Sequence, residues 1–231
     1  MRPIEIEPVR RLSLFRDIEP ENFGTLVKQA LVQRFPARTE LFHEGELPDF
    51  LHVVIDGSVE LYGSLHDRET AVALLGANAS FSIAAIVRDE PYLTSARTLA
   101  TTKLLMIPAN AVRTVFERDA SFARATVCEL AQRYRELVQD LKGSRLRVGI
   151  ERLASYILDL DSARGHNGQV QLHIEKRTLA SYLGITPEHL SRAFSELARH
   201  GAEVHGQIIT ITDAQRLMEL AGPALTARTG S

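Results

Sequence analysis

The chain has 231 residues, of which 45% are apolar and 24% are charged, proportions that predict a folded globular protein. Its 27 basic and 29 acidic residues leave a formal net charge of −2, which excludes a protein that coats nucleic acid through charge alone but allows a local basic surface. The single cysteine, Cys128, excludes an internal disulfide and any four-cysteine zinc or iron–sulfur site. We see no signal-peptide pattern and no run of about 18 apolar residues, so we expect a cytoplasmic protein with no membrane partner.

The spacing of apolar residues along the chain changes near Phe35. Residues 12–34 carry apolar side chains at helical spacing, and Pro20 is expected to open a helix at Glu21. From Phe35 to about Ile107, short apolar runs alternate with turn residues, which predicts an antiparallel β-sandwich or barrel. Asp56-Gly57, between two such runs, predicts a hairpin. The predicted strands are 40–43, 50–55, 58–62, 71–75, 94–99 and 103–107.

Helical spacing returns between Pro108 and Lys142. An apolar seam repeats there every four and three residues, the spacing by which one helix packs on another. We interpret it as a dimer seam; the alternative is a helix lying on its own β-domain. Gly143-Ser144 is the predicted hinge, followed by an amphipathic helix over 145–160. The seam consists of Ala123, Val127, Leu130, Tyr134, Leu137 and Leu141.

The segment 176–201 predicts a helix-turn-helix. Leu179, Ala180 and Leu183 share one face of a short helix, and Gly184 permits the left-handed conformation that ends it. Thr186 is expected to cap a second helix with Pro187 at its first position. Flanking it, we expect a short strand over 170–174, a hairpin over 204–211 and a last helix from Asp213 to Leu220.

The outward face of the second helix predicts contacts with double-stranded DNA. Glu188 and Arg192 are four residues apart and share a face. Arginine pairs with guanine O6 and N7, and glutamate accepts from cytosine N4. The alternative is a solvated ion pair on a helical hairpin. The candidate DNA-binding residues are Glu188, Ser191, Arg192, His189, Thr178, Lys176, Arg177 and Ser195.

The order of these segments and the motif LASYLGITPEHLSRAFSELARHG resemble the Crp/Fnr family of bacterial transcription regulators, and FLHVVIDGSVELY is similar to that family's β-roll hairpin. The resemblance covers roughly residues 10–221. It implies an α+β fold: an N-terminal β-roll (a jelly roll like cyclic-nucleotide-binding domains), a long dimerisation helix and a C-terminal winged helix-turn-helix. The corresponding regions are 1–107 for the effector domain, 108–142 for the dimer helix and 143–231 for the DNA-binding domain.

The resemblance also implies partners. Glu188, Ser191 and Arg192 match the E-x-x-S-R pattern of the Fnr-like branch, which implies half-sites like TTGAT read as a palindrome by a homodimer. Family members usually contact RNA polymerase from exposed β-roll loops.

Departures from the family bear on the effector. The cyclic-AMP-binding branch carries F-G-E-L and R-S-A, where this chain has SFSIAAI and LTSA. Ala84 is taken to stand at the ribose-binding Glu and Thr94 at the phosphate-binding Arg, so cAMP held in the usual way is not expected. No cysteine precedes Cys128, so the iron–sulfur cluster of the oxygen-sensing branch is not expected either.

The Fnr-type DNA signature, combined with the lack of cysteines before Cys128 and of the usual cAMP-binding residues, resembles the nitric-oxide-responsive Dnr/Nnr-type regulators, in which haem is the suspected sensor. Candidate haem ligands are His43, His52 and His66, each with an ordinary alternative: a surface turn, a partly buried core histidine and a solvated side chain, respectively. Covalent haem is excluded because no C-x-x-C-H motif occurs. Cys128 is expected to be a small packed hydrophobe.

An effector pocket between β-roll and dimer helix would be mostly apolar, suiting a gas on haem, a hydrophobic ligand or simply a filled core. No P-loop, G-x-G-x-x-G or H-E-x-x-H occurs, so an enzyme is not expected. Two readings stay open: a regulator switched by an effector, and a constitutive DNA-binding activator whose β-roll binds nothing. The candidate pocket residues are Phe81, Ile83, Ala84, Thr94, Ser95, Val127, Leu130 and Tyr134, with Leu74, Ile86 and Ala96 beside them.

Overall fold

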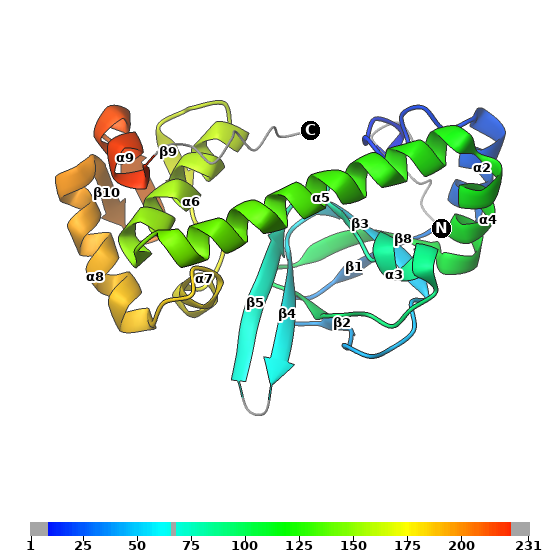
Figure 1. Cartoon of the computed structure of the whole chain (residues 1–231), viewed down its shortest axis with the longest axis horizontal. Helices are drawn as coiled ribbons and strands as arrows, with labels where there is room; N and C mark the ends of the chain where they lie inside the picture. Colours follow the sequence, from blue (N-terminus) through cyan, green and yellow to red (C-terminus); the bar gives the residue numbers. More distant parts are fainter. Residues whose placement is uncertain (1–8, 66–67, 223–231) are drawn as a thin grey trace. The chain divides into compact units, whose positions relative to one another are not determined.

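The computed structural model describes residues 9–65 and 68–222. The chain divides into two compact units, and the division falls between Arg133 and Tyr134, inside the long helix α5 (Ala120–Leu146; Figure 1). Within the described ranges, no helix is long and apolar enough to cross a membrane.

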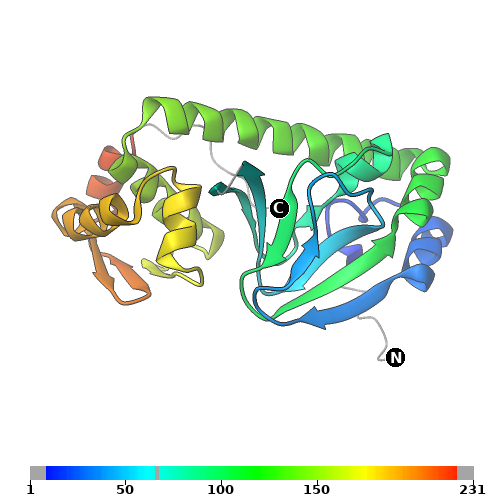
Figure 2. The same ribbon diagram turned by 90° about the horizontal axis from the view of Figure 1, so that it is seen from below.

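The N-terminal unit contains two four-stranded antiparallel sheets (Figure 2), which confirms the predicted β-domain. One sheet has the strand order β1-β8-β3-β6 and is called sheet A; the other, sheet B, has the order β2-β7-β4-β5. The strands are β1 (Leu31–Phe35), β2 (Glu40–Phe42), β3 (Phe50–Asp56), β4 (Val59–Leu65), β5 (Arg68–Leu75), β6 (Ser80–Phe81), β7 (Ser95–Thr98) and β8 (Thr102–Pro108).

Strand β8 of sheet A has buried side chains on both of its faces. On β8, Leu104 belongs to an apolar cluster formed with residues of sheet B, whereas Leu105 and Ile107 belong to a cluster formed with helices. Successive side chains of a strand point to opposite faces, so β8 serves two cores. The helices on the second face are α2 (Pro20–Gln29), α3 (Ile83–Arg88), α4 (Ala109–Arg118) and the start of α5.

Asp119 organises these helices. Its Oδ1 accepts hydrogen bonds from the backbone N–H groups of Ser121 (3.0 Å) and Phe122 (2.9 Å), which caps α5. Its Oδ2 accepts from Glu19 N (2.9 Å) and Asn22 Nδ2 (3.0 Å), which ties α2 to the same point. Desolvation raises the pKa of this buried carboxyl, but the four hydrogen bonds outweigh it and the pKa is lowered.

The predicted helix opening at Pro20-Glu21 is confirmed as α2, but helical structure over the rest of 12–34 is not found. Only α2 is a long helix there; residues 11–18 form turns, and Leu31–Phe35 is strand β1. Leu14, Phe15 and Ile18 are buried as the pattern indicated, but in non-helical backbone. β1 is a strand because it pairs along its whole length with β8, a tertiary contact that overrides local spacing.

The predicted hairpin at Asp56-Gly57 is also wrong. The turn exists, with Gly57 at φ 91°, but β3 pairs with β8 and β6 whereas β4 pairs with β5 and β7. The turn therefore carries the chain from sheet A to sheet B. Gly57 is required because a Cβ there would lie 2.6 Å from Thr102 Oγ1 and 2.7 Å from the Thr101 carbonyl oxygen.

The predicted hinge at Gly143-Ser144 lies inside a helix. α5 continues to Leu146, and the next helix, α6, begins at Gly149 rather than at Arg145. A glycine in a helix interior costs only about 1 kcal/mol relative to alanine, which neighbouring turns can offset. The corner of the chain is therefore at Arg147-Val148.

The C-terminal unit packs helices around a small antiparallel sheet of order β10-β11-β9. Asp213 caps the last helix by accepting a hydrogen bond from Arg216 N (3.1 Å), as predicted. The elements are α6 (Gly149–Ala163), β9 (Gln169–Gln171), α7 (Lys176–Tyr182), α8 (Pro187–Leu197), a 3₁₀ turn η1 (Ala198–His200), β10 (Ala202–His205), β11 (Ile208–Ile211) and α9 (Ala214–Ala221).

Candidate nucleic-acid interface

The start of α8 is built by local signals that the sequence predicts correctly. Gly184 adopts φ 62° in the turn after α7. Thr186 Oγ1 accepts a hydrogen bond from His189 N (3.2 Å), and Pro187 occupies the first helical position. The two helices and their turn thus form the predicted helix-turn-helix.

The helix-turn-helix has a complete apolar side. Leu190, Phe194 and Leu197 of α8 are buried against Leu179 and Ala180 of α7. Ala180 is 1% exposed, as expected for the apolar face that it shares with Leu179. The predicted outward residues Glu188, His189, Ser191, Arg192 and Ser195 are all exposed.

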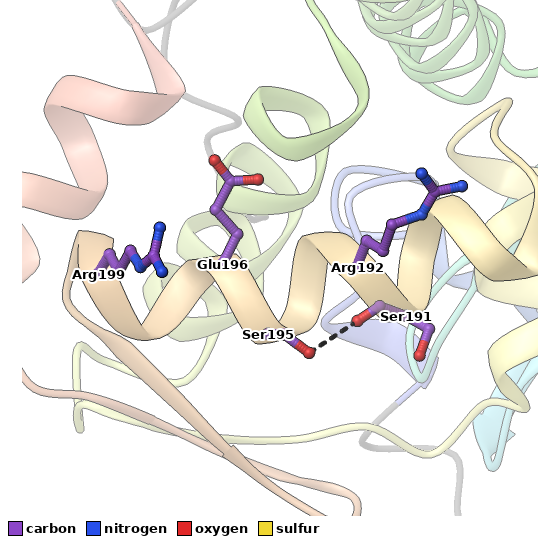
Figure 3. Close-up of a pocket in the computed structure, with 5 residues that line it drawn as sticks. All are labelled: Ser191, Arg192, Ser195, Glu196 and Arg199. Carbon is purple, nitrogen blue, oxygen red and sulfur yellow. Dashed lines mark hydrogen bonds between the residues drawn. The ribbon is translucent and has the colours of Figure 1, made fainter.

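The exposed face of α8 forms a shallow concavity (Figure 3). Arg192 and Glu196, one helical turn apart, project from the same side of the helix, while Ser191 and Ser195 lie on an adjacent side. Ser195 Oγ donates to the Ser191 carbonyl oxygen (3.2 Å). Glu196 and Arg199 also line this concavity but were not among the predicted DNA-binding residues. They follow Arg192 by four and seven residues, a helical spacing that could have placed them on the same face.

Glu188 and Arg192 are electrostatically linked but do not form a tight pair. Hydrogen bonds from the Glu188 backbone N–H and the Thr186 hydroxyl, together with the charges of His189 and Arg192, lower the pKa of the Glu188 carboxyl. Arg192 takes part in no ion pair within the described part of the chain. Its guanidinium is therefore available to an external acceptor.

The first turn of α7 supplies further cationic groups beside α8. Lys176 and Arg177 are exposed, and Thr178 is half-buried. Lys176 Nζ lies 5.6 Å from the centre of the Phe194 ring, which orients its stem along α8. The hairpin β10–β11 follows α8 as a wing, with Gly206 (φ 65°) in its turn.

The predicted seam lies along α5 as an exposed apolar stripe. Val127, Tyr134, Leu137 and Leu141 are 60%, 69%, 55% and 52% exposed, respectively. Leu130 differs, because it packs against the helix-side core of its own unit. Cys128 is exposed, so its prediction as a packed hydrophobe is wrong.

The candidate pocket residues are distributed over several environments. Phe81 is buried between the two sheets, whereas Ile83 is buried in the helix-side core with Leu130 packed against it. Ala84 and Val127 are exposed, and Thr94 is half-buried. Ser95 is buried, and its Oγ accepts from Glu44 N (3.0 Å). Tyr134 belongs to the other unit.

Comparison with known proteins identifies both parts of the chain. Residues 151–220 match the family model of the Crp-like helix-turn-helix domain, and residues 32–119 match that of the cyclic nucleotide-binding domain. The chain is 24% identical over 221 residues to the CRP-like cAMP-activated global transcriptional regulator of Mycobacterium tuberculosis, covering 93% of this chain and 99% of that protein. It is 26% identical over 179 residues to the transcriptional activator protein FnrA of Stutzerimonas stutzeri, covering 75% and 69%.

Among solved structures, FixK2 from Bradyrhizobium japonicum has the same fold, with a TM-score of 0.77, 23% identity and coverage of 84% of this chain and 98% of that one. The chain is a DNA-binding transcription regulator, with a cyclic-nucleotide-binding-like β-domain, a long helix and a C-terminal helix-turn-helix. It belongs to the Crp/Fnr family, whose members are not enzymes.

The residues present do not fit a cyclic nucleotide held in the usual way. Ala84, taken as the position of the ribose-binding Glu, is exposed, and Ile83 beside it is buried in the helix-side core. Neither side chain offers a carboxylate, and Thr94 offers no cation. Arg97, on β7, is already bound to Glu60 (2.7 Å) and Glu69 (2.8 Å).

The described candidate haem ligands have ordinary structural roles. His43 is exposed in the turn after β2. His52 is 3% exposed, stacks on Phe81 at 4.9 Å between ring centres, and its Nδ1 lies 3.2 Å from Ser82 Oγ. Binding haem would require His52 to leave this packing. His66 lies outside the described residues.

Proposed function

We propose that the protein works as a homodimer that reads a TTGAT-like palindrome and is switched by a small-molecule, gas or redox effector other than cAMP. In this proposal residues 1–107 form the effector domain, residues 108–142 form the dimerisation helix region, which contains α4 and most of α5, and residues 143–231 form the DNA-binding domain.

The observation that supports DNA reading is the exposed face of α8. Glu188, Ser191 and Arg192 share the first turns of a helix whose other side is fully buried. In helix-turn-helix proteins these turns enter the major groove. Arg192 would donate to guanine, and Glu188 would accept from cytosine on the complementary strand. His189 and Ser195 flank these residues, while Lys176, Arg177 and Thr178 would contact phosphates.

The proposed dimer rests on the apolar stripe of α5. Val127, Tyr134, Leu137 and Leu141 are each more than half exposed, at heptad spacing. Surface helices seldom leave such a row open to water, because its burial is favourable by about 25 cal/mol per Å² of apolar surface. A second copy of α5 would cover the row and place the two recognition helices about one two-fold axis.

An effector would act by binding one arrangement of the dimer better than another. The alternative is a constitutive activator whose β-roll binds no ligand. One observation favours it: Phe42, Tyr92, Phe81 and His52 fill the space between the sheets, with the rings of Phe42 and Tyr92 stacked at 3.8 Å between centres.

RNA polymerase is the second proposed partner. Leu47 and Leu93 are 65% and 89% exposed on β-roll loops. The backbone bonds from Gly45 N to Tyr92 O and from Tyr92 N to Glu46 O, both 2.9 Å, hold these loops side by side. An exposed apolar pair on adjoining loops suits contact with a protein.

Fluorescence anisotropy tests the proposal. Ligand-free protein is titrated at fixed salt into a duplex with TTGAT and ATCAA half-sites separated by four base pairs, with a scrambled duplex as control. Selective binding of the TTGAT duplex by the ligand-free protein favours the constitutive activator. Selectivity that emerges only with an added effector, with haem and nitric oxide as the first trial, favours the switch.

A matched pair of variants assigns the base contact. Arg192→Ala should lose about 1–3 kcal/mol of discrimination at the guanine. Arg199→Ala, in the 3₁₀ turn η1 that follows α8, should weaken binding to both duplexes alike. Retention of the full TTGAT preference by Arg192→Ala would refute the assignment.

A further inference from the structure

The guanidinium of Arg152, in the first turns of α6, joins two segments of the C-terminal unit. Its Nε donates to the Leu183 carbonyl oxygen (2.7 Å) and its Nη2 to that of Gly184 (3.5 Å). Its Nη1 donates to the carbonyl oxygens of Arg147 and Ser144, the latter at 3.4 Å. One side chain thus binds four backbone carbonyls.

The four carbonyls come from the end of α5 and from the turn between α7 and α8. The last carbonyls of a helix have no partner within the helix and favour a cation nearby. Arg152 satisfies that need at the end of α5 and also holds the turn that precedes the recognition helix. A planar guanidinium reaches both segments at once, because its donors diverge in a fixed fork.

Packing at the same point is close. A Cβ placed on Gly149 would lie 2.9 Å from Cγ2 of Ile185, in the turn before α8. Arg147 Nη1 also donates to Ser155 Oγ (2.8 Å), and Glu151 Oε2 accepts from Val148 N (3.0 Å). Several side-chain contacts besides those of Arg152 therefore fix the segment between α5 and α6.

We propose that Arg152 is a positioning residue that locks the end of α5 to the helix-turn-helix and thereby sets the spacing between half-sites that the dimer accepts. The spacing part of this inference rests on the proposed dimer and its DNA sites. A conformational switch in this protein would then act on the part of α5 that precedes Ser144, while the corner between α5 and α6 keeps its geometry.

Spin-label distance measurement tests the lock without DNA. Labels are attached to cysteines at Arg135 and Ser195, both exposed, in a Cys128→Ser background, and the labelled protein is mixed with excess unlabelled chain so that distances within one protomer dominate. We expect a narrow distribution that Arg152→Ala broadens about twofold or more. Arg152→Lys should restore part of the order, because it keeps the charge but lacks the fork.

Arg164→Ala is the matched control, because Arg164 also donates to a backbone carbonyl, that of Gln171 (3.4 Å), but away from the corner. It should leave the distribution unchanged. Should Arg152→Ala fail to fold, Gly149→Ala serves instead: its added methyl should shift the mean distance. Distributions that match wild type in every folded variant at Arg152 or Gly149 overturn the proposal.

Duplexes with spacers of three, four and five base pairs test the spacing. Wild type should prefer one spacer by about tenfold or more, and Arg152→Ala should reduce that preference to about threefold while binding a single half-site as wild type does. Unchanged spacer preference refutes the role in spacing. Failure of wild type to select TTGAT over a scrambled duplex would instead refute the proposed function, and the spin-label result would still decide the lock.

Discussion

Acidification should destabilise the N-terminal unit through one buried histidine. His52 is enclosed by Phe42, Phe50 and Phe81, at 5.5, 6.4 and 4.9 Å between ring centres. Burial lowers its pKa from 6.5 to about 4, although a hydrogen bond with the Phe50 backbone acts in the opposite direction. At pH 7.5 the ring is therefore neutral in the folded chain and largely neutral in the unfolded chain.

The sign follows from proton binding. Between pH 6.5 and 4 the unfolded chain binds a proton at this position and the folded chain does not, so stability falls as the pH falls. One pKa unit corresponds to about 1.36 kcal/mol, so His52 should cost about 2.5 kcal/mol between pH 7.5 and 4.5.

Urea unfolding followed by circular dichroism measures this, since the chain has no tryptophan. Carboxylates also titrate in this range, so the quantity of interest is the difference between wild type and His52→Phe. The variant loses the Ser82 contact and is less stable at pH 7.5, but should lose about 2.5 kcal/mol less than wild type on acidification. Val54→Ala, buried on the same strand, controls for lower stability and should retain the wild-type pH dependence. Parallel pH profiles for wild type and His52→Phe would refute the reasoning.

Three further perturbations test the fold and the assembly. Asp119→Ala should lower the free energy of unfolding by about 2–4 kcal/mol, because four donors lose their acceptor, whereas Ala at the exposed Asp17 should change it by less than about 0.5 kcal/mol; urea titration compares them. Gly57→Ala should destabilise more than Gly45→Ala, because both glycines have positive φ (91° and 89°) but only Gly57 lacks room for a Cβ; equal melting temperatures would contradict this. Leu137→Glu combined with Leu141→Glu should yield monomers in sedimentation, because both residues are exposed on the stripe, whereas Cys128→Glu, off the stripe, should remain dimeric. A stable dimer of the double variant would contradict the seam; Leu130 is avoided because it supports its own core.

Local signals predicted the recognition region well. Thr186, Pro187 and Gly184 act within a few residues of one another, so their roles in capping and turning are readable from the sequence. The outward placement of Glu188 and Arg192 follows from helical periodicity once the buried positions are known.

Errors arose where distant contacts decide the structure. Asp56-Gly57 forms a turn, but the strands on either side choose partners elsewhere in the chain. Leu31–Phe35 is a strand because of β8, more than 60 residues away. Arg152 carried no recognisable signal, since its acceptors at Leu183 and Gly184 are 31 and 32 residues distant and belong to the backbone.

The apolar stripe on α5 has a consequence for how the protein responds to its own abundance. If a second chain covers the stripe, as proposed, dimer formation stabilises the folded chain. The apparent free energy of unfolding then rises with protomer concentration by mass action. Binding to a two-part DNA site would then rise more steeply than linearly with total protein. A modest change in expression would alter promoter occupancy even at constant effector level, so gene dosage would itself be a regulatory input.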